Sequence, residues 1–208
     1  MSGTVQERAV KTREAILRAA AELFDEYGYS AASISKIIKR AEVTAGAMYF
    51  HFSSKSDLAH AVMIEQGDGL EMPPGEDGLQ RLIDITLYLA DELQGNPRLR
   101  AGVRLAIEQG DWGSQDDSAY RYWAEMFTAQ LHAAQKRGDL LPDANAEEVA
   151  WLLVSSYSGT QLLSHISAGR ADLHHRVITL WRYLLPGIAA PAVKPLLRFS
   201  APSDRDAS

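Results

Sequence analysis

Apolar residues between Thr12 and Tyr27 recur every three or four positions, a spacing typical of a helix with one buried face. Gly28 follows directly and favours a helix end at that point. Ser33 is a favourable N-cap for a second helix of about two turns, and Thr44 is a favourable N-cap for a third. Two short helices separated by so few residues must cross steeply, which is the arrangement of a helix-turn-helix.

Helical spacing continues through the rest of the chain and is interrupted by polar loops at residues 67–78 and 110–117. No stretch alternates between apolar and polar residues as a strand does, so the sequence predicts an all-α fold of about nine helices. We expect three parts, namely a helix-turn-helix domain over residues 1–60, a second helical domain over 61–190 and a flexible tail over 191–208. The later helices are expected over residues 55–66, 79–93, 98–108, 118–136, 147–167 and 173–185.

Composition and charge disfavour several classes of protein, among them disulfide-stabilised proteins, proteins that coat nucleic acid and membrane proteins. The chain has 208 residues, 46% of them hydrophobic, and no cysteine, so it can bury a core but has neither disulfides nor thiolate metal sites. Residues 1–60 contain eight Lys/Arg against seven Asp/Glu, whereas the remainder contains 13 against 20. The net charge of −6 disfavours a protein that coats nucleic acid, but the N-terminal part is compatible with a local site. No apolar leader or membrane-length segment occurs, so we expect a cytoplasmic protein that does not contact a membrane.

The third expected helix has the composition of a helix that reads double-stranded DNA. Its first turn holds only small side chains, so its backbone can approach the bases of the major groove closely. Tyr49 and His51 add polar tips further along, which can bind phosphates or can merely pack against the first helix. The residues expected to approach the bases are Ala45, Gly46 and Ala47.

The run from Met48 to Leu58 resembles the hallmark of the TetR family of repressors, which has the form L-Y-x-H-F-x-x-K-x-x-L. This resemblance covers the chain from Thr12 through Leu58, and it implies an operator-binding repressor in which Met48 and Phe52 belong to the core. The phosphate contacts that it implies are Thr44, Tyr49, His51 and Lys55.

Two positions depart from the family pattern. Glu42 stands in the turn where members usually carry glycine, and Ala45 stands where a basic or polar residue is common. The bases that the protein reads are therefore left open, and other residues gain weight as DNA contacts. The additional candidates are Ser33, Lys39 and Lys11, with Lys36, Arg40 and Arg13 as further basic residues. A solvated helix face is the competing interpretation for each of these basic side chains.

The second helical domain resembles the γ-butyrolactone autoregulator receptors of actinomycetes in LQGNPRLRAGVRLAIEQ, in the run from Tyr120 to Trp123 and in YSGTQLLS. This resemblance implies a pocket for a small butyrolactone, butenolide or furan-type signal that controls antibiotic biosynthesis, with Trp123 in its lining. Helical spacing places Phe127 one turn and Gln130 two turns after Trp123, so an aromatic wall and a polar group can face one cavity. Aromatic residues at this spacing can equally be core. Further candidates for hydrogen bonds to the ligand are Tyr88, Tyr157 and Gln161.

The last two expected helices carry broad apolar surfaces, which can be bundle core or a homodimer interface. The resemblance favours a two-fold interface of four helices, and two DNA half-sites also require two recognition helices. Residues 1–60 are thus expected to bind DNA, and residues 61–190 are expected to bind the ligand and to dimerise.

Other classes of protein find less support in the sequence. The chain has no nucleophile elbow, P-loop, dinucleotide fingerprint or H-E-x-x-H motif, so we expect no enzyme, catalytic residue, cofactor or metal site. Two alternatives stay open: a helical interaction protein that does not bind DNA, and a pseudo-receptor of the same family that responds to an antibiotic or another apolar small molecule.

Overall fold

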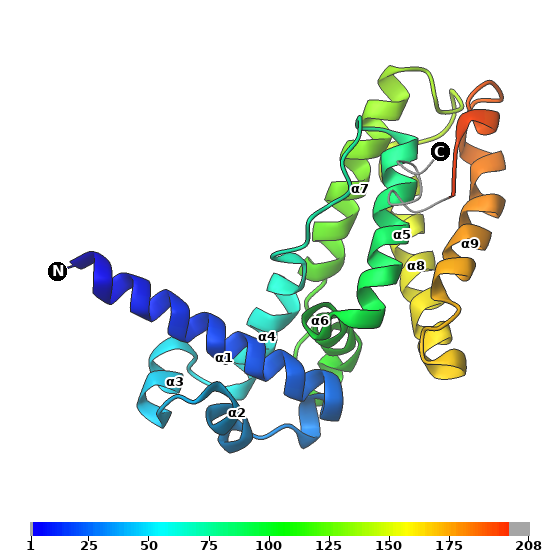
Figure 1. The fold of residues 1–208 in the computed structure, drawn as a ribbon. Helices are drawn as coiled ribbons and strands as arrows, with labels where there is room; N and C mark the ends of the chain where they lie inside the picture. Colours follow the sequence, from blue (N-terminus) through cyan, green and yellow to red (C-terminus); the bar gives the residue numbers. More distant parts are fainter. Residues whose placement is uncertain (1, 200–208) are drawn as a thin grey trace, which may run out of the picture. The chain divides into compact units, whose positions relative to one another are not determined.

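The computed structural model describes residues 2–199, and within this range it contains nine α-helices, three short 3-10 helices and no strand (Figure 1). One isolated β-bridge joins Leu140 and Ala189. The all-α fold predicted from the sequence is confirmed. Between residues 2 and 199, no helix combines the length and the apolar character that a membrane crossing requires.

The helices divide between two compact units. Residues 2–69 and 96–119 form the first unit, and residues 70–95 and 120–199 form the second. This division differs from the boundary expected at residue 60, because α6 packs on α1 and α4. The first unit contains α1 (Ser2–Ala31), α2 (Ile34–Ala41), α3 (Ala45–His51), α4 (Lys55–Ile64), η1 (Glu65–Gly67), α6 (Pro97–Ile107) and η2 (Glu108–Trp112). The second contains α5 (Leu79–Gly95), most of α7 (Ser118–Lys136), α8 (Ala146–Ala168), α9 (Leu173–Ile188) and η3 (Lys194–Leu196).

Side-chain caps fix the starts of the short helices in the first unit. Ser33, Thr44 and Ser54 each accept a hydrogen bond from the backbone N–H three residues later, at 3.3, 3.1 and 3.0 Å. Such caps satisfy N–H groups that have no partner inside the helix. All three caps were expected from the sequence and are confirmed.

The long first helix is interrupted at Gly28, whose φ of 73° and ψ of 176° are not helical. Glycine adopts this conformation without the steric penalty of a side chain. A Cβ atom here would also lie 2.5 Å from Nη2 of Arg104 on α6, so a larger residue would displace the end of this arginine side chain. The helix end predicted at Gly28 is therefore confirmed.

Arginines of α6 join this helix to α1 within the first unit. The guanidinium of Arg100 binds both carboxylate oxygens of Asp25, with Nε 3.0 Å from Oδ1 and Nη2 2.7 Å from Oδ2. Nη1 of Arg104 donates to the carbonyl oxygen of Asp25 at 2.8 Å. These contacts span 75 and 79 positions along the chain and explain why α6 belongs to the first unit.

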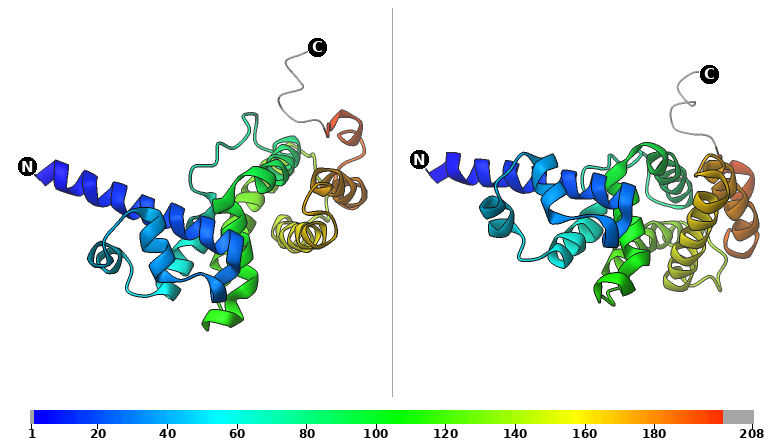
Figure 2. Two further views of the ribbon diagram at one scale, coloured as in Figure 1. Left: turned by 60° about the horizontal axis from the view of Figure 1, so that its bottom comes forward. Right: turned by 90° about the horizontal axis from the view of Figure 1, so that it is seen from below.

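The core of the second unit is built around α5, and α8 and α9 lie side by side in it (Figure 2). Trp181 of α9 is completely buried, and its Nε1 donates to Oγ1 of Thr86 on α5 at 2.7 Å. The Thr86 hydroxyl in turn donates to the carbonyl oxygen of Ile83 at 2.8 Å. The two polar groups are thus satisfied by each other and by the backbone, which lets them occupy an apolar core.

The chain after α9 contacts α5 at Arg198, within the segment of residues 191–208 that was expected to form a flexible tail. The backbone N–H of Arg198 donates to Oε1 of Gln80 at 2.8 Å, and Nε2 of Gln80 donates to the carbonyl oxygen of Arg198 at 3.0 Å. Leu197 is buried beside this pair. The sequence of this segment does not show that Leu197 is buried or that the backbone of Arg198 pairs with an amide of α5. Residues 200–208, the other part of the expected tail, lie outside the described residues.

Candidate DNA-binding and ligand-binding sites

A tight turn joins α2 to α3. Glu42 has φ 56° and ψ 38°, which is the left-handed conformation, at a cost of roughly 1 kcal/mol for a residue with a side chain. The N–H of Glu42 donates to the carbonyl oxygen of Lys39 and that of Val43 donates to Ile38, at 3.3 and 3.2 Å, so the end of α2 is closed. Glutamate at the usual glycine position therefore keeps the geometry of the turn.

The helix α3 has one buried and one exposed face. Met48 and Phe52 are 0% and 3% exposed, which confirms that they are core residues. Tyr49 is 56% exposed and Phe50 is 79% exposed. The exposed face consists of Ala45, Gly46, Tyr49 and Phe50, while Ala47 and His51 are half-buried.

Phe50 was not singled out from the sequence. Its ring lies edge-on to the ring of His51, with the centroids 5.0 Å apart, and most of its surface faces solvent. The sequence signal that could have identified it is its position one turn after Gly46, on the face that the first turn of α3 exposes.

The side chain of Lys55 differs from that of a freely exposed lysine. Its ammonium lies 4.3 Å from the centroid of the Tyr29 ring and donates to the carbonyl oxygen of Ser30 at 3.5 Å. Desolvation by burial lowers the pKa of Lys55. The position at the start of α4 agrees with the expectation, but the charged group is partly engaged by the end of α1.

The other candidate DNA contacts lie on α1, on α2 and at its start. Ser33 accepts its capping bond and shares a hydrogen bond of 3.1 Å with the hydroxyl of Ser35. Lys11 is exposed and forms an ion pair of 2.6 Å with Glu7 one turn earlier. Lys39 is also exposed and has no carboxylate within 4.0 Å among residues 2–199.

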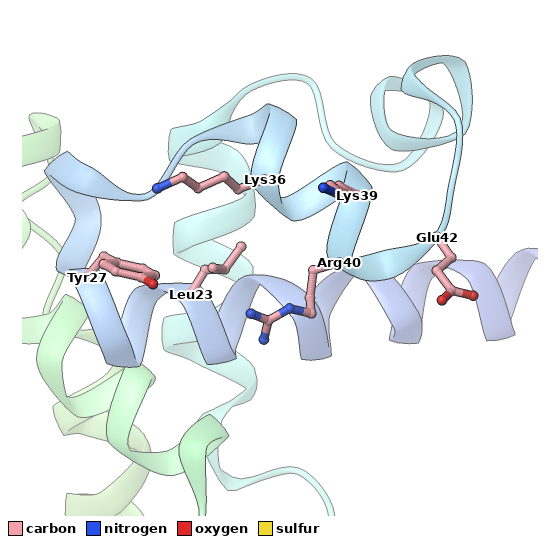
Figure 3. A pocket seen from close by; sticks show the side chains of 6 residues that line it. All are labelled: Leu23, Tyr27, Lys36, Lys39, Arg40 and Glu42. Atoms are coloured by element: carbon pink, nitrogen blue, oxygen red, sulfur yellow. The ribbon is translucent and has the colours of Figure 1, made fainter.

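A groove between α1 and α2 gathers basic side chains (Figure 3). The ammonium of Lys36 lies 4.9 Å from the centroid of the Tyr27 ring, and Nη1 of Arg40 lies 2.7 Å from Oε2 of Glu22. Lys39 lines the same groove. Lys36 and Arg40 therefore contact side chains of α1, whereas the ammonium of Lys39 has no carboxylate partner in the part of the chain that the structure describes.

Trp123 and Phe127 are neighbours on α7, as their spacing predicted. Their ring centroids are 6.4 Å apart, Trp123 is half-buried and Phe127 is 2% exposed. Tyr122 lies edge-on to Trp123 with centroids 5.1 Å apart. Tyr88 on α5 is half-buried, and burial raises its pKa.

The polar ligand candidates already have partners within the second unit. Oε1 of Gln130 accepts from the backbone N–H of Gly78 and Nε2 donates to Oδ1 of Asp77, both at 3.0 Å. The hydroxyl of Tyr157 donates to the carbonyl oxygen of Thr86 at 3.2 Å, and burial raises its pKa well above the usual range. Oε1 of Gln161 accepts from Arg170 at 3.5 Å. The two glutamines thus have structural contacts that helical spacing could not indicate.

The helices α8 and α9 expose large apolar side chains. Trp151, Leu163 and Ile166 are 42%, 54% and 73% exposed on α8, and Tyr183 is 79% exposed on α9. Leu152 and Leu162 extend the exposed apolar face of α8. Large apolar side chains that gather on an exposed surface are typical of interaction sites.

Two short capped helices joined by a tight turn, the second with a small and exposed first turn, define a helix-turn-helix protein that binds DNA. Residues 16–62 match the profile of the bacterial regulatory proteins of the tetR family, and residues 76–190 match that of the tetracyclin repressor-like C-terminal domain. The chain belongs to the TetR family of transcriptional regulators, and it is a repressor of the TetR type and not an enzyme. Both the family and the resemblance to γ-butyrolactone receptors are confirmed.

Relatives of known identity agree with this assignment. The chain is 41% identical to the A-factor receptor protein of Streptomyces griseus over 194 residues, which are 90% of this chain and 67% of the relative. The structure of TylP, a TetR regulator from Streptomyces fradiae, matches with a TM-score of 0.82 and 43% identity, covering 94% of this chain and 87% of that one. The structure of a gamma-butyrolactone receptor described as ArpA-like matches with a TM-score of 0.66 and 32% identity over 89% and 92% of the two chains.

Proposed function

We propose that this protein binds a palindromic operator as a homodimer and is released by a small γ-butyrolactone, butenolide or furan-type signal that controls antibiotic biosynthesis. The exposed face of α3 supports the proposal that the protein binds DNA. The similarity to the A-factor receptor protein and to a gamma-butyrolactone receptor supports the proposal for the ligand. A second candidate is a pseudo-receptor that responds to an antibiotic or another apolar molecule. It is favoured by the partners that Gln130 and Gln161 already have, since these leave a largely aromatic set of candidate ligand contacts.

The proposed DNA interface is the exposed face of α3. The methyl groups of Ala45 and Ala47 and the ring of Phe50 suit contact with thymine methyl groups, while Gly46 lets the backbone approach the bases. Tyr49 supplies an exposed hydroxyl for a phosphate. Flanking phosphate contacts are proposed for Lys11, Ser33, Lys39, Thr44, His51 and Lys55.

A gel shift with the operator region upstream of the protein's own gene tests this interface. We expect specific binding that weakens as salt rises, and binding equal to that of random DNA would refute the repressor proposal. Phe50→Ala should weaken operator binding while leaving binding to random DNA little changed. Ile107→Ala, an equally apolar change at an exposed position of α6, is the matched control and should leave both unchanged.

The proposed dimer interface is the exposed apolar face of α8 and α9. Burial of Leu163 and Tyr183 against the same face of a second copy removes apolar surface from water, which is favourable. Leu163→Glu should therefore shift the protein to monomers in sedimentation velocity. Leu196→Glu, at a leucine of η3 that is even more exposed, should leave the dimer intact, and an unchanged dimer in Leu163→Glu would contradict the proposal.

The proposed ligand site includes Trp123 and Phe127, with Tyr88 and Tyr157 and with Gln130 and Gln161 at its polar positions. Butyrolactones, butenolides and furan carboxylates should be compared with antibiotics in a thermal-shift screen, because a ligand of the folded state raises Tm. Trp123→Ala should abolish the shift and keep operator binding. A full ligand response in this variant would show that the site lies elsewhere, and a response to antibiotics alone would favour the pseudo-receptor.

A further inference from the structure

The ammonium of Lys55, the first residue of α4, rests on the face of the Tyr29 ring near the end of α1. It lies 4.3 Å from the ring centroid and 3.5 Å from the carbonyl oxygen of Ser30, which is a long hydrogen bond. Among residues 2–199, no carboxylate lies within 4.0 Å of this ammonium. Burial lowers the pKa of Lys55 and raises the pKa of Tyr29, so the pair is partly shielded from water, which strengthens the attraction between a cation and a ring. The ring is therefore the main group that holds this ammonium in place.

Tyr29 is itself fixed by contacts from other parts of the first unit. Its ring lies nearly parallel to that of the completely buried Phe24, with the centroids 6.1 Å apart, and 5.8 Å from the ring of Trp112 in η2. Its backbone N–H donates to Oε2 of Glu108 at 2.9 Å. The other oxygen of this carboxylate accepts from Nε of Arg104 at 2.7 Å, which holds the carboxylate in turn. The ring is thus a fixed support for a side chain placed on it.

The contact with Tyr29 leaves the ammonium of Lys55 able to bind a phosphate. An ammonium has three N–H donors, and the carbonyl oxygen of Ser30 accepts from one of them. A lysine that moves freely must be fixed when it binds a phosphate, at a cost in side-chain entropy. Fixing the side chain before DNA binds removes this cost, which corresponds to about threefold in affinity for each side chain.

We infer that Tyr29 is a positioning residue for DNA binding, whose ring holds the ammonium of Lys55 where it binds an operator phosphate. This inference rests on the proposed function, in which Lys55 is a phosphate contact. A homodimer carries two such pairs, so loss of the ring should weaken operator binding about tenfold. Phenylalanine at this position should act as tyrosine does, because the face of the ring and not the hydroxyl attracts the ammonium.

The test measures how much Lys55→Gln weakens operator binding in wild type, in Tyr29→Phe and in Tyr29→Leu, by fluorescence anisotropy at one salt concentration. The factor should be the same in wild type and in Tyr29→Phe, and about tenfold smaller in Tyr29→Leu. Lys39→Gln is the matched control, since it removes the same charge from a proposed phosphate contact on α2. Its factor should be the same in all three proteins, because a general loss of stability would affect both lysines alike.

A second series decides the question if Tyr29→Leu does not fold. Tyr29 is replaced by phenylalanines that carry successively more ring fluorines, which withdraw negative charge from the face of the ring and change its size little. Operator affinity should fall with each added fluorine. The same series combined with Lys55→Gln should show a constant affinity, because the ring then has no cation to hold. A constant affinity in the series with Lys55 intact would overturn the inference.

The outcomes separate the inference from the function on which it rests. If wild type binds the operator no better than random DNA, the proposed function is wrong and the inference falls with it. If binding is specific and Lys55→Gln leaves it unchanged, Lys55 is not a phosphate contact and the inference is overturned, while the repressor function stands. An equal factor for Lys55→Gln in all three proteins would overturn the inference alone. The same follows if Tyr29→Leu reduces the factors for Lys55→Gln and Lys39→Gln equally, because the role of the ring is then only structural.

Discussion

Lys39 and Arg40 are adjacent basic residues of α2 with different partners, and they allow phosphate contacts to be separated from general charge. Arg40 is paired with Glu22 of α1 at 2.7 Å, whereas Lys39 has no carboxylate within 4.0 Å among the described residues. We expect Lys39 to bind a phosphate of the operator and Arg40 to contribute much less. The substitutions Lys39→Gln and Arg40→Gln remove the same charge from the same helix.

The size of the effect follows from counterion release. Each phosphate neutralised by a protein cation contributes about −0.9 to the slope of log K against log salt concentration. A homodimer carries two copies of Lys39, so Lys39→Gln should make the slope less steep by about 1.8. When the salt concentration rises from about 50 to about 200 mM, the ratio of the wild-type affinity to the Lys39→Gln affinity should then fall about tenfold. Arg40→Gln should change the slope by less than about half of this amount, because its charge is already balanced by Glu22.

Fluorescence anisotropy with labelled operator DNA at several salt concentrations measures both slopes. Equal slopes for Lys39→Gln and wild type would show that this lysine is only a solvated residue of α2. Equal changes in Lys39→Gln and Arg40→Gln would show that overall charge, and not a particular contact, controls binding. Either result would refute the assignment of Lys39 to the DNA interface.

Three further substitutions test other parts of the structure. Thr44→Ala removes the cap that accepts from Ala47 at 3.1 Å, and should lower the free energy of unfolding by about 1 kcal/mol in urea denaturation; an unchanged midpoint would argue against the cap. Thr86→Val leaves the buried Nε1 of Trp181 without its acceptor and should cost about 1–3 kcal/mol. The effect should be largely absent when Trp181→Phe is already present, so additive effects would contradict a direct bond. Tyr157 has a pKa raised by burial above its usual value of 10.0, so its contribution to stability is complete below that pH and is lost as the pH rises above it. Tyr157→Phe should therefore reduce the loss of stability above pH 10, and an unchanged pH profile would count against this burial.

Local features of this fold could be predicted from the sequence because their causes are local. A serine or threonine cap needs only a suitable residue before an amphipathic segment, and Ser33, Thr44 and Ser54 were all identified in this way. The end of the first helix at Gly28 followed from a single residue type. The prediction that Met48 and Phe52 belong to the core rested instead on the resemblance to a family motif with fixed spacing.

Contacts between distant segments could not be predicted in the same way. Helical spacing placed Gln130 on the same side of α7 as Trp123, but it could not show that the amide holds the backbone at Gly78. The same limit applies to Lys55, whose position at a helix start was evident while its contact with Tyr29 was not. Periodicity assigns a residue to a face, and only the folded chain supplies its partner.

The arginines of α6 provide a route by which ligand binding could affect the DNA-binding helices, other than the chain that crosses the expected domain boundary at residue 60. If the domains met only at residue 60, a conformational change in the ligand-binding domain could reach the DNA-binding domain only through the chain at that point. In the structure, Arg100 and Arg104 bind Asp25 of α1, and Nε of Arg98 donates to the carbonyl oxygen of Glu65 directly after α4, at 3.1 Å. The helix α6 is therefore joined to both helices that support α2 and α3. A ligand that displaces α6 must either move these helices with it or break the bidentate ion pair between Arg100 and Asp25. Moving the helices together keeps these charges paired.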